Sequence, residues 1–483
     1  MTDVSVDNVV LVTVDSLRAD AVGAYDPARH TPVLDDLADD ATVFEHAFAT
    51  GNWTPFSFPG ILASRPVFAD SGRIGVNESR TLASVLSAAD LETAGYNAAN
   101  GFLTGHWGYD DGFDTFESFV ADVGSGFYSR YLAAHPTVEA WVQLATSPFR
   151  RVASRLRGDA DAQPFHDASR GLDVERGATD FIAETDGPFF LWVHYMDAHT
   201  PYVPAPRYVR DVSGSRLGTH RMVLAHTKTG LGLEVSDRTL GDLRTLYQGA
   251  VRQVDASIGR LREALSAAGV ADDTAFVVAG DHGEEFQEHG HLAHYPKLYD
   301  ELARVPLIVD VPGLEGRRVE GAVGLDAVPP TVCDAVGVEP AGGWDGRSLL
   351  PAVADGSSPA ADPIVSVTVC GEEVTQQPIP RGLADGDLLV GVRTAEWTYI
   401  RNAETGAEEL YHRPSDPDQQ TDRTPTTPGT DAAAAAEELR PVAEAHAASL
   451  TDAGDASDDG DDGDGAAEID EDLETRLSAL GYR

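Results

Sequence analysis

Two residue types are nearly missing from this chain of 483 residues, which has two cysteines (Cys333 and Cys370) and two lysines (Lys228 and Lys297). Two cysteines cannot form a disulfide framework, and their scarcity indicates a reducing compartment. No apolar run approaches the roughly 20 residues that a membrane-spanning helix needs. The N-terminal segment also lacks the basic and apolar regions of a signal peptide. We therefore expect a cytoplasmic protein without a membrane span.

Positive charge is also scarce, since 35 basic residues stand against 79 acidic ones and the formal net charge is -44. A surface this negative repels itself unless salt screens it, which suits a salt-loving organism. The alternative is an acidic surface that binds a basic partner. Nucleic acid is not an expected partner, because its own backbone is negatively charged.

Three apolar runs that lead into acidic or histidine residues organise the rest of the chain. They are residues 9–14 before Asp15, residues 189–196 before Asp197 and His199, and residues 274–280 before Asp281 and His282. Such runs are typical of central strands buried on both faces of a sheet. Open α/β sheets bind their ligands at the carboxyl ends of the strands. We therefore expect one polar site along this edge of the sheet.

Other segments predict the surrounding architecture. Apolar residues at helical spacing across 246–261 predict an amphipathic core helix. Residues 201–236 are interpreted as a long active-site loop. Short alternating segments within 360–411 predict a small antiparallel sheet. The basic patch at 149–157 is interpreted as a solvated helix face, with a substrate or partner site as the alternative.

These patterns divide the chain into three parts. Residues 1–355 form the predicted catalytic α/β domain, and residues 356–425 form a small α+β subdomain. Residues 426–483 form an acidic tail that is partly disordered by composition and could end in a helix.

The residue types at the strand ends are those that bind a divalent cation. Asp15, Asp281 and His282 offer two carboxylates and an imidazole, which suit a hard or borderline ion. Thr54, at the expected start of a helix, adds a hydroxyl whose pKa such an ion would lower, giving an alkoxide nucleophile. His199 could hold a substrate oxygen or protonate a leaving group. A plain turn after each strand is the alternative, which the joint pattern disfavours.

Several motifs occur in a fixed order along nearly the whole chain. They are residues 8–20, 31–35, 112–116, 197–202, 280–284, 298–301 with 305–307, and 409–411 with 416–418. In this order they resemble the sulfatase family of the alkaline phosphatase superfamily. The resemblance implies a mostly parallel sheet between helix layers, with a small C-terminal antiparallel sheet.

The resemblance also implies an activity: hydrolysis of sulfate or related esters through a covalent intermediate on a metal-bound nucleophile. Asp15, Asp281 and His282 match the family's metal ligands, here for one Ca²⁺, Mn²⁺ or Mg²⁺ ion. His199 matches a histidine that contacts the ester group.

The nucleophile motif departs from the family pattern. The family has C/S-x-P-S-R, in which the first residue becomes formylglycine. Aligning residues 61–64 with the motif's L-L-T-G places Thr54 at that position and Phe58 at the position of the arginine. Threonine cannot give the aldehyde. A threonine nucleophile is instead used by phosphodiesterase and lipoteichoic-acid-synthase-like branches of the superfamily.

Further departures lie around the predicted substrate. The lysine and histidine of the family's K-W-H-L-G motif are replaced by Asn100 and Phe102, and the second aspartate of the opening pair is Ser16. Lys297 lies near the position of a later active-site lysine. His289, His291 and His294 crowd the loop after Gly283 and could add ligands or a general acid. We assign Asn100, His294 and Lys297 to substrate binding.

The sequence thus predicts a salt-adapted, metal-dependent hydrolase of sulfate or phosphate esters with Thr54 as nucleophile. Its expected substrate is a small-molecule ester or one linked to a glycan or lipid. One alternative is a phosphodiesterase or phosphoglycerol-type transferase. Another is a catalytically inactive ligand-binding homologue, because Phe58, Asn100 and Phe102 replace three charged or polar family residues.

Overall fold

The computed structural model describes residues 5–119 and 170–458, apart from residues 215, 216, 218, 231–234, 295, 361 and 371–379. The basic patch at 149–157, the acidic run after residue 458 and the predicted terminal helix lie outside the described residues. The strands are β1 (Asn8–Val14), β2 (Thr42–Phe48), β3 (Glu92–Asn97), β4 (Thr115–Glu117), β5 (Phe189–Tyr195), β6 (Thr274–Gly280), β7 (Glu285–Phe286), β8 (Leu292–Ala293), β9 (Arg304–Val305), β10 (Leu307–Asp310), β11 (Arg317–Gly324), β12 (Ile364–Cys370), β13 (Asp387–Arg393), β14 (Trp397–Asn402) and β15 (Glu408–His412). The helices are α1 (Pro32–Asp40), α2 (Thr54–Ala63), α3 (Leu82–Ser87), α6 (Gly171–Glu184), α7 (Pro206–Ser213), α8 (Thr219–Gly230), α9 (Asp237–Ala268), α10 (Asp300–Ala303), α11 (Val328–Ala335), α12 (Leu350–Asp355) and α13 (Asp431–Asp458).

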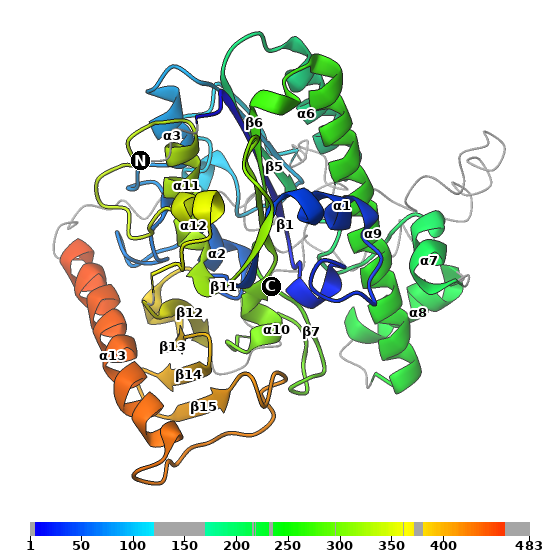
Figure 1. The fold of residues 1–483 in the computed structure, drawn as a ribbon. Helices are drawn as coiled ribbons and strands as arrows, with labels where there is room; N and C mark the ends of the chain where they lie inside the picture. The colour runs from blue at the N-terminus through cyan, green and yellow to red at the C-terminus, as the bar shows by residue number, and fades with distance from the viewer. Residues whose placement is uncertain are drawn as a thin grey trace, which may run out of the picture.

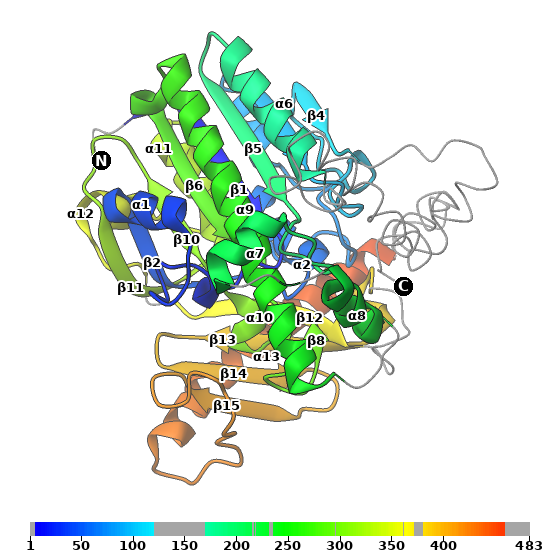
Figure 2. The same cartoon turned by 90° about the vertical axis from the view of Figure 1, so that its right-hand side faces the viewer.

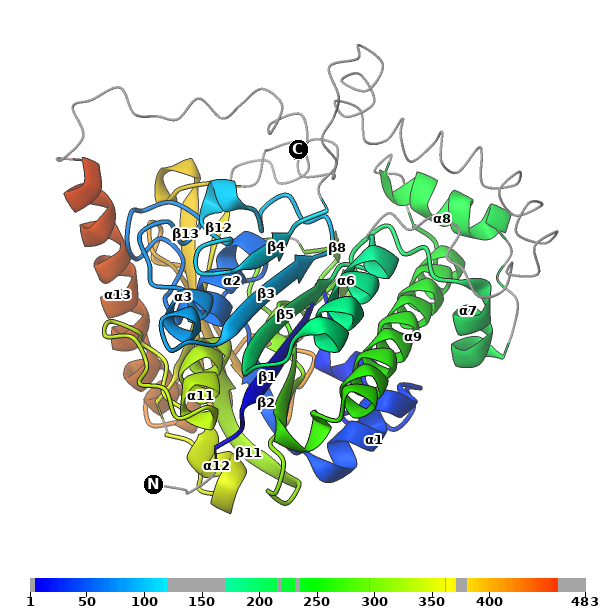
Figure 3. The same cartoon turned by 90° about the horizontal axis from the view of Figure 1, so that it is seen from above.

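A nine-stranded sheet forms the centre of the molecule, in the order β11-β2-β10-β6-β1-β5-β3-β4, with β9 paired to β2. Figure 3 shows its strands β1, β5, β3 and β4 side by side. β1 runs parallel to both of its neighbours, and Val14 lies level with Tyr195 on β5 and Gly280 on β6. β10 is antiparallel to β2 and β6. Because β1, β5 and β6 end at one edge, the polar residues that follow them meet there. The predicted mostly parallel sheet between helix layers is confirmed.

Alternation along β1 builds a hydrophobic core on each face of the sheet. Val9 and Leu11 face α2, α3 and α11, whereas Val10 and Val12 face α1, α6 and α9. Figure 2 shows α6 and α9 crossing the second face. Each of these buried aliphatic side chains contributes about 1.5–3 kcal/mol to the hydrophobic stabilisation of the fold. The sheet is therefore a rigid support for the residues at its edge.

Residues 201–236 are not the continuous loop that the sequence predicted. They contain α7 and α8, both of which pack against α9. α7 begins with Pro206, whose fixed φ suits the first helical turn, and it buries Tyr208 and Val209. The prediction was wrong because it rested on the length of the segment. Burial of Tyr208 and Val209 stabilises α7 as a helix.

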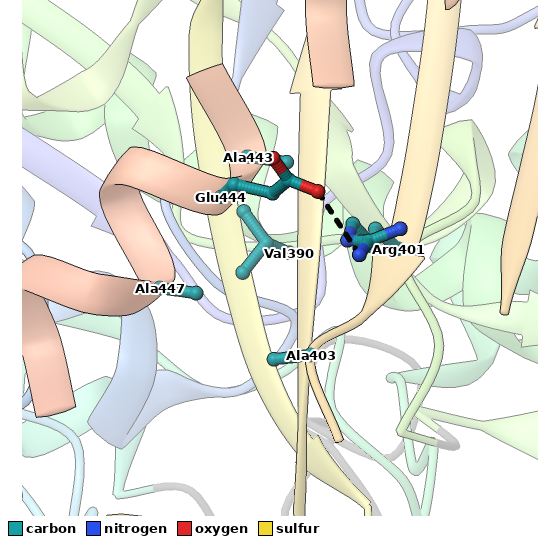
Figure 4. A pocket seen from close by; sticks show the side chains of 6 residues that line it. All are labelled: Val390, Arg401, Ala403, Ala443, Glu444 and Ala447. Carbon is teal, nitrogen blue, oxygen red and sulfur yellow. Dashed lines mark ion pairs between the residues drawn. The ribbon is translucent and has the colours of Figure 1, made fainter. Parts of the chain in front are cut away.

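The predicted small antiparallel sheet is confirmed as β12-β13-β14-β15, with α13 lying along it (Figure 1). Between α13 and this sheet is a hollow of about 120 Å³, next to an ion pair of 3.0 Å between Arg401 and Glu444 (Figure 4). The sheet shares the core of the main domain, and Val367 N donates to Thr50 O at 2.9 Å. The second sheet thus contacts the chain just before Thr54. No helix in the described part of the chain is long and apolar enough to cross a bilayer.

Candidate active site

Asp15, Asp281 and His282 form a buried cluster at the carboxyl ends of β1 and β6. One ligand atom from each lies within 4.8 Å of the others, and all three side chains are fully or almost fully buried. Asp281 Oδ1 accepts hydrogen bonds from the backbone N–H groups of Ser16 at 3.0 Å and His282 at 2.7 Å. Asp281 Oδ2 has no hydrogen-bond partner. One oxygen therefore fixes the carboxylate, and the other is left available for a cation.

The tautomer of His282 also suits a metal ligand. Its Nδ1 lies 2.8 Å from Gly283 O, an acceptor, so Nδ1 carries the proton. Nε2 then offers its lone pair at 3.5 Å from Asp15 Oδ1 and 3.7 Å from Asp281 Oδ2. Burial lowers the pKa of His282 to about 4, which keeps the imidazole neutral. Neutral imidazole, oriented through its other nitrogen, is the form that coordinates metals.

The two carboxylates have opposite electrostatic environments. Burial and the neighbouring charge of Asp15 raise the pKa of Asp281 well above its usual range. Burial alone would also raise the pKa of Asp15, but His199 and the other histidines around it hold that pKa well below its usual range. Two facing carboxylates in a dry site repel each other, and a divalent cation would neutralise both. The donor set of carboxylate oxygens and one imidazole fits Ca²⁺, Mn²⁺ or Mg²⁺.

Thr54 is the first residue of α2 and is buried beside this cluster. Its Oγ1 donates to Asp15 Oδ2 at 3.2 Å and lies 3.5 Å from His282 Nε2. All ten residues of α2 are buried, as expected for a helix that is apolar all round. Ser57 Oγ donates to Asp281 O at 2.5 Å and fixes the helix against β6. The free N–H groups at this helix start favour a negative charge at the position of Thr54.

Asn100, which follows β3, completes the polar lining. Its Nδ2 donates to Asp15 Oδ2 at 3.2 Å and lies 3.4 Å from Thr54 Oγ1, and its Oδ1 accepts from Phe102 N at 3.0 Å. The predicted residues Asp15, Thr54, Asn100, Asp281 and His282 are thus neighbours in space.

His199 and His294 lie beside the cluster and are less buried than its three candidate ligands, so we call their side the open side. The ring centroids of His199 and His294 are 5.0 Å apart, as are those of His282 and His294. Burial lowers the pKa of His199. Burial would also lower the pKa of His294, but Glu284, 3.0 Å from its Nδ1, raises it instead. The two histidines therefore differ in how readily they hold a proton.

Lys297 and His289 have other partners. Lys297 Nζ lies 3.6 Å from Glu409 Oε1 on β15, and its predicted role in substrate binding is not supported by a contact with the cluster. His289 bonds to Glu301 and to Gln419 O.

Sequence reasoning missed His194, which lies within β5. Its Nε2 is 3.8 Å from Asp15 Oδ2, and the ring is fully buried. The available signal was a histidine inside an otherwise apolar strand.

Comparison with known proteins now decides the family. Residues 7–338, more than half of the chain, match the family model described as Sulfatase. The chain belongs to the sulfatase family. The predicted assignment to a family of ester hydrolases is therefore confirmed, while the nucleophile, the metal and the substrate are not decided by this match.

Two relatives of this sulfatase-family chain differ in how much they share with it. The multifunctional alkaline phosphatase superfamily protein PehA of Trinickia caryophylli is 30% identical over 210 residues, or 38% of this chain and 41% of PehA. The ulvan-active sulfatase of Formosa agariphila is 24% identical over 433 residues, or 86% of this chain and 76% of that enzyme. The chain thus spans less than half of PehA.

Solved structures support the fold. One, of a protein bound to its substrate D-glucosamine-2-N,6-O-disulfate, has a TM-score of 0.67 at 17% identity and covers 93% of this chain and 99% of its own. The phosphonate monoester hydrolase of Agrobacterium radiobacter has a TM-score of 0.62 at 20% identity and covers 93% and 96%. At these identities the likeness is one of fold.

Proposed function

We propose that the chain is a divalent-metal-dependent hydrolase of sulfate or phosphate esters in which Thr54 is the nucleophile. The position of Thr54 Oγ1 carries this proposal, because it lies between Asp15 Oδ2 at 3.2 Å and His282 Nε2 at 3.5 Å, at the start of a buried helix. A hydroxyl in that place can share the cation of the ligand cluster. Family membership supports ester hydrolysis as the reaction class.

Asp15, Asp281 and His282 would hold the cation, which lowers the pKa of a nearby hydroxyl and stabilises charge on the ester oxygens. Thr54 Oγ1 gives up its proton to solvent water and attacks sulfur or phosphorus. The bond to the departing alcohol oxygen breaks, and this oxygen takes up a proton. Water then attacks the resulting threonine ester and restores the hydroxyl of Thr54; the product is sulfate from a sulfate monoester, phosphate from a phosphate monoester, and a phosphate monoester from a phosphodiester.

The two open-side histidines have different proposed roles. His199 has a lowered pKa and is neutral at pH 7, so we assign it to a hydrogen bond with an ester oxygen or with the departing alcohol. The raised pKa of His294 makes it the better carrier of positive charge, which suits binding of an anionic ester. Asn100 Nδ2 is a further donor beside Thr54.

The charge of the site favours a singly charged ester. Two carboxylates offset the two positive charges of the cation, and Phe58 and Asn100 are neutral where the family motifs have an arginine and a lysine. A sulfate monoester or a phosphodiester carries one negative charge, whereas a phosphate monoester is close to doubly charged at neutral pH. We therefore expect turnover of sulfate monoesters or phosphodiesters to exceed that of phosphate monoesters.

A turnover assay tests this function. Native protein, Thr54→Ala and Thr54→Ser are compared in molar KCl with Mn²⁺, Ca²⁺ or Mg²⁺, using nitrophenyl sulfate, nitrophenyl phosphate and bis-nitrophenyl phosphate. Loss of the nucleophile should lower kcat by roughly three orders of magnitude or more, and Thr54→Ser should retain part of the activity.

Two results would contradict the proposal in different ways. Turnover that survives Thr54→Ala would mean that another residue attacks the ester. Bound Mn²⁺ without turnover of any of the three esters would favour an inactive ligand-binding homologue.

A further inference from the structure

His194 occupies an unusual position for a polar side chain. Its ring is fully buried in β5, and its Nε2 has no hydrogen-bond partner. Buried polar atoms are usually hydrogen-bonded, so an unpartnered one next to a candidate metal ligand needs an explanation. The nearest acceptor recorded for this atom is Asp15 Oδ2 at 3.8 Å. That distance is too long for a hydrogen bond in this structure, although the two groups face each other.

Hydrogen bonds behind the ring indicate which nitrogen carries its proton. Trp192 Nε1, which can only donate, lies 3.0 Å from Thr13 Oγ1, so this oxygen is an acceptor. The hydrogen of Thr13 is then available to His194 Nδ1 at 3.0 Å or to Val193 O at 3.5 Å. Donation to Nδ1 would be the shorter of these two bonds, and it would leave the proton of a neutral ring on Nε2.

The opposite tautomer is disfavoured by the same contacts. It would direct the lone pair of Nε2 at a carboxylate oxygen in a dry site, where two acceptors repel each other. With the proton on Nε2, Trp192, Thr13 and His194 form a chain in which every hydrogen is directed towards Asp15 Oδ2.

Phe58 keeps this chain dry. Its ring meets His194 edge-on with centroids 5.0 Å apart and lies 5.6 Å from the ring of Trp192. Phe58 is itself fully buried. An apolar wall therefore covers the ring of His194 and leaves Asp15 as the polar group in front of Nε2.

We propose that His194 is a positioning residue that holds Asp15 in the orientation needed to bind the metal. Asp15 Oδ2 accepts hydrogen bonds from Thr54 Oγ1 and Asn100 Nδ2, each at 3.2 Å. When Thr54 gives up its proton, this oxygen loses one of its donors. His194 Nε2–H is then the donor directed at it. The inference rests on the metal site of the proposed function.

Two substitutions of matched size test the hydrogen bond. His194→Gln keeps an N–H donor at about the reach of Nε2, whereas His194→Leu removes it. Mn²⁺ affinity is measured by calorimetry, the ligand geometry by the EPR spectrum of the bound Mn²⁺, and stability by thermal unfolding in EDTA. Loss of such an outer-shell hydrogen bond lowers metal affinity about 10–100-fold. We expect this loss and a changed spectrum for His194→Leu, and affinity close to native for His194→Gln.

The stability measurement separates positioning from packing. His194→Leu also removes the buried hydrogen bond between Thr13 Oγ1 and His194 Nδ1, so a lower unfolding temperature in EDTA measures the loss of packing and of that bond, whereas Mn²⁺ affinity and the EPR spectrum measure the loss of the donor at Nε2. Thr13→Val leaves the imidazole in place, removes its donor at Nδ1, and should weaken Mn²⁺ binding in the same direction. It also provides the test if His194→Leu does not fold.

Three results would overturn the inference. Native Mn²⁺ affinity in His194→Leu, or in Thr13→Val if His194→Leu does not fold, would show that Asp15 needs no such donor. Equal losses in His194→Gln and His194→Leu would show that the ring only fills space. Absence of Mn²⁺ binding by the native protein would overturn the metal site, and with it the proposed function. Native Mn²⁺ binding that the His194 variants leave unchanged would overturn the role of His194 alone.

Discussion

Replacing Asp281 by asparagine should stabilise the metal-free protein. The asparagine Oδ1 can still accept from the N–H groups of Ser16 and His282, at 3.0 and 2.7 Å. The unpartnered Oδ2 becomes an NH₂ group that faces acceptors of Asp15 and His282 instead of repelling them. Residues held in an active site often reduce stability in this way for the sake of function.

The size of this stabilisation follows from the distance between the carboxylates of Asp15 and Asp281. Two negative charges no more than 4.8 Å apart repel by about 3.5 kcal/mol or more at an effective dielectric constant of 20. The raised pKa of Asp281 lets its carboxyl take up a proton and relieve part of this repulsion. We expect Asp281→Asn to raise the free energy of unfolding by about 1–3 kcal/mol in the absence of metal.

Urea unfolding in molar KCl measures this change, with EDTA in one series and Mn²⁺ in the other. Mn²⁺ should stabilise the native protein but not Asp281→Asn, because a ligand stabilises only the state that binds it. An Asp281→Asn protein less stable than native in EDTA would refute the reasoning.

Asp300→Asn is the matched control, since it makes the same change at a second buried carboxylate. Asp300 accepts from Arg413 Nε at 2.8 Å and Arg393 Nε at 3.3 Å. Burial would raise its pKa, but the two arginines lower it to about 2. Asp300→Asn should therefore destabilise the protein by about 3–5 kcal/mol, because it leaves two buried cations without their partner. The change from aspartate to asparagine should thus raise the free energy of unfolding at position 281 and lower it at position 300.

Three further predictions concern other parts of the chain. Burial opposes a charge on His289, but its bond to Glu301 raises its pKa from 6.5 to about 9. The stabilisation that charged His289 gains from Glu301 is therefore complete below pH 6.5 and is lost as the pH rises through about 9. In urea titrations, His289→Gln should reduce this loss of stability with rising pH. At Gly283, a Cβ would lie 1.9 Å from Glu301 O, so Gly283→Ala should lower the unfolding temperature. Gly241 lies in α9, where an added Cβ would meet no atom within 4 Å, so Gly241→Ala should raise stability by about 0.5–1 kcal/mol. Dialysis into low-millimolar KCl should reduce the helical circular dichroism signal, because a net charge of -44 is then poorly screened, and an unchanged spectrum would contradict this.

The edge of the sheet could be predicted because burial on both faces leaves a simple pattern. Central parallel strands appear as apolar runs, and their carboxyl ends lie together by topology. Asp15, Asp281 and His282 follow such runs directly, and the structure groups them. Asn100 was predicted from its place in a motif, and its contact with Thr54 depends on the loop after β3.

Features that depend on strand register could not be predicted in this way. His194 lies opposite Thr13 only because β1 and β5 pair with that register, which no local pattern in either strand specifies. α7 was missed for a related reason, since burial of Tyr208 against α9 is a tertiary contact. The proposed boundary at residue 355 also stays a prediction, because the second sheet shares the main core.

The residues that depart from the sulfatase motifs support one another, which argues against a site that has decayed. Ser16 Oγ donates to Asp15 Oδ1 at 2.8 Å, and Asn100 Nδ2 donates to the other oxygen of the same carboxylate at 3.2 Å. Asn100 Oδ1 in turn accepts from Phe102 N, and the ring of Phe58 packs against the ring of His194. Random loss of function would be expected to leave unpaired polar atoms or cavities at these positions. The replacements of the family's aspartate and lysine, Ser16 and Asn100, are instead both hydrogen-bonded to Asp15, which supports the proposal of a working site adapted to a singly charged ester.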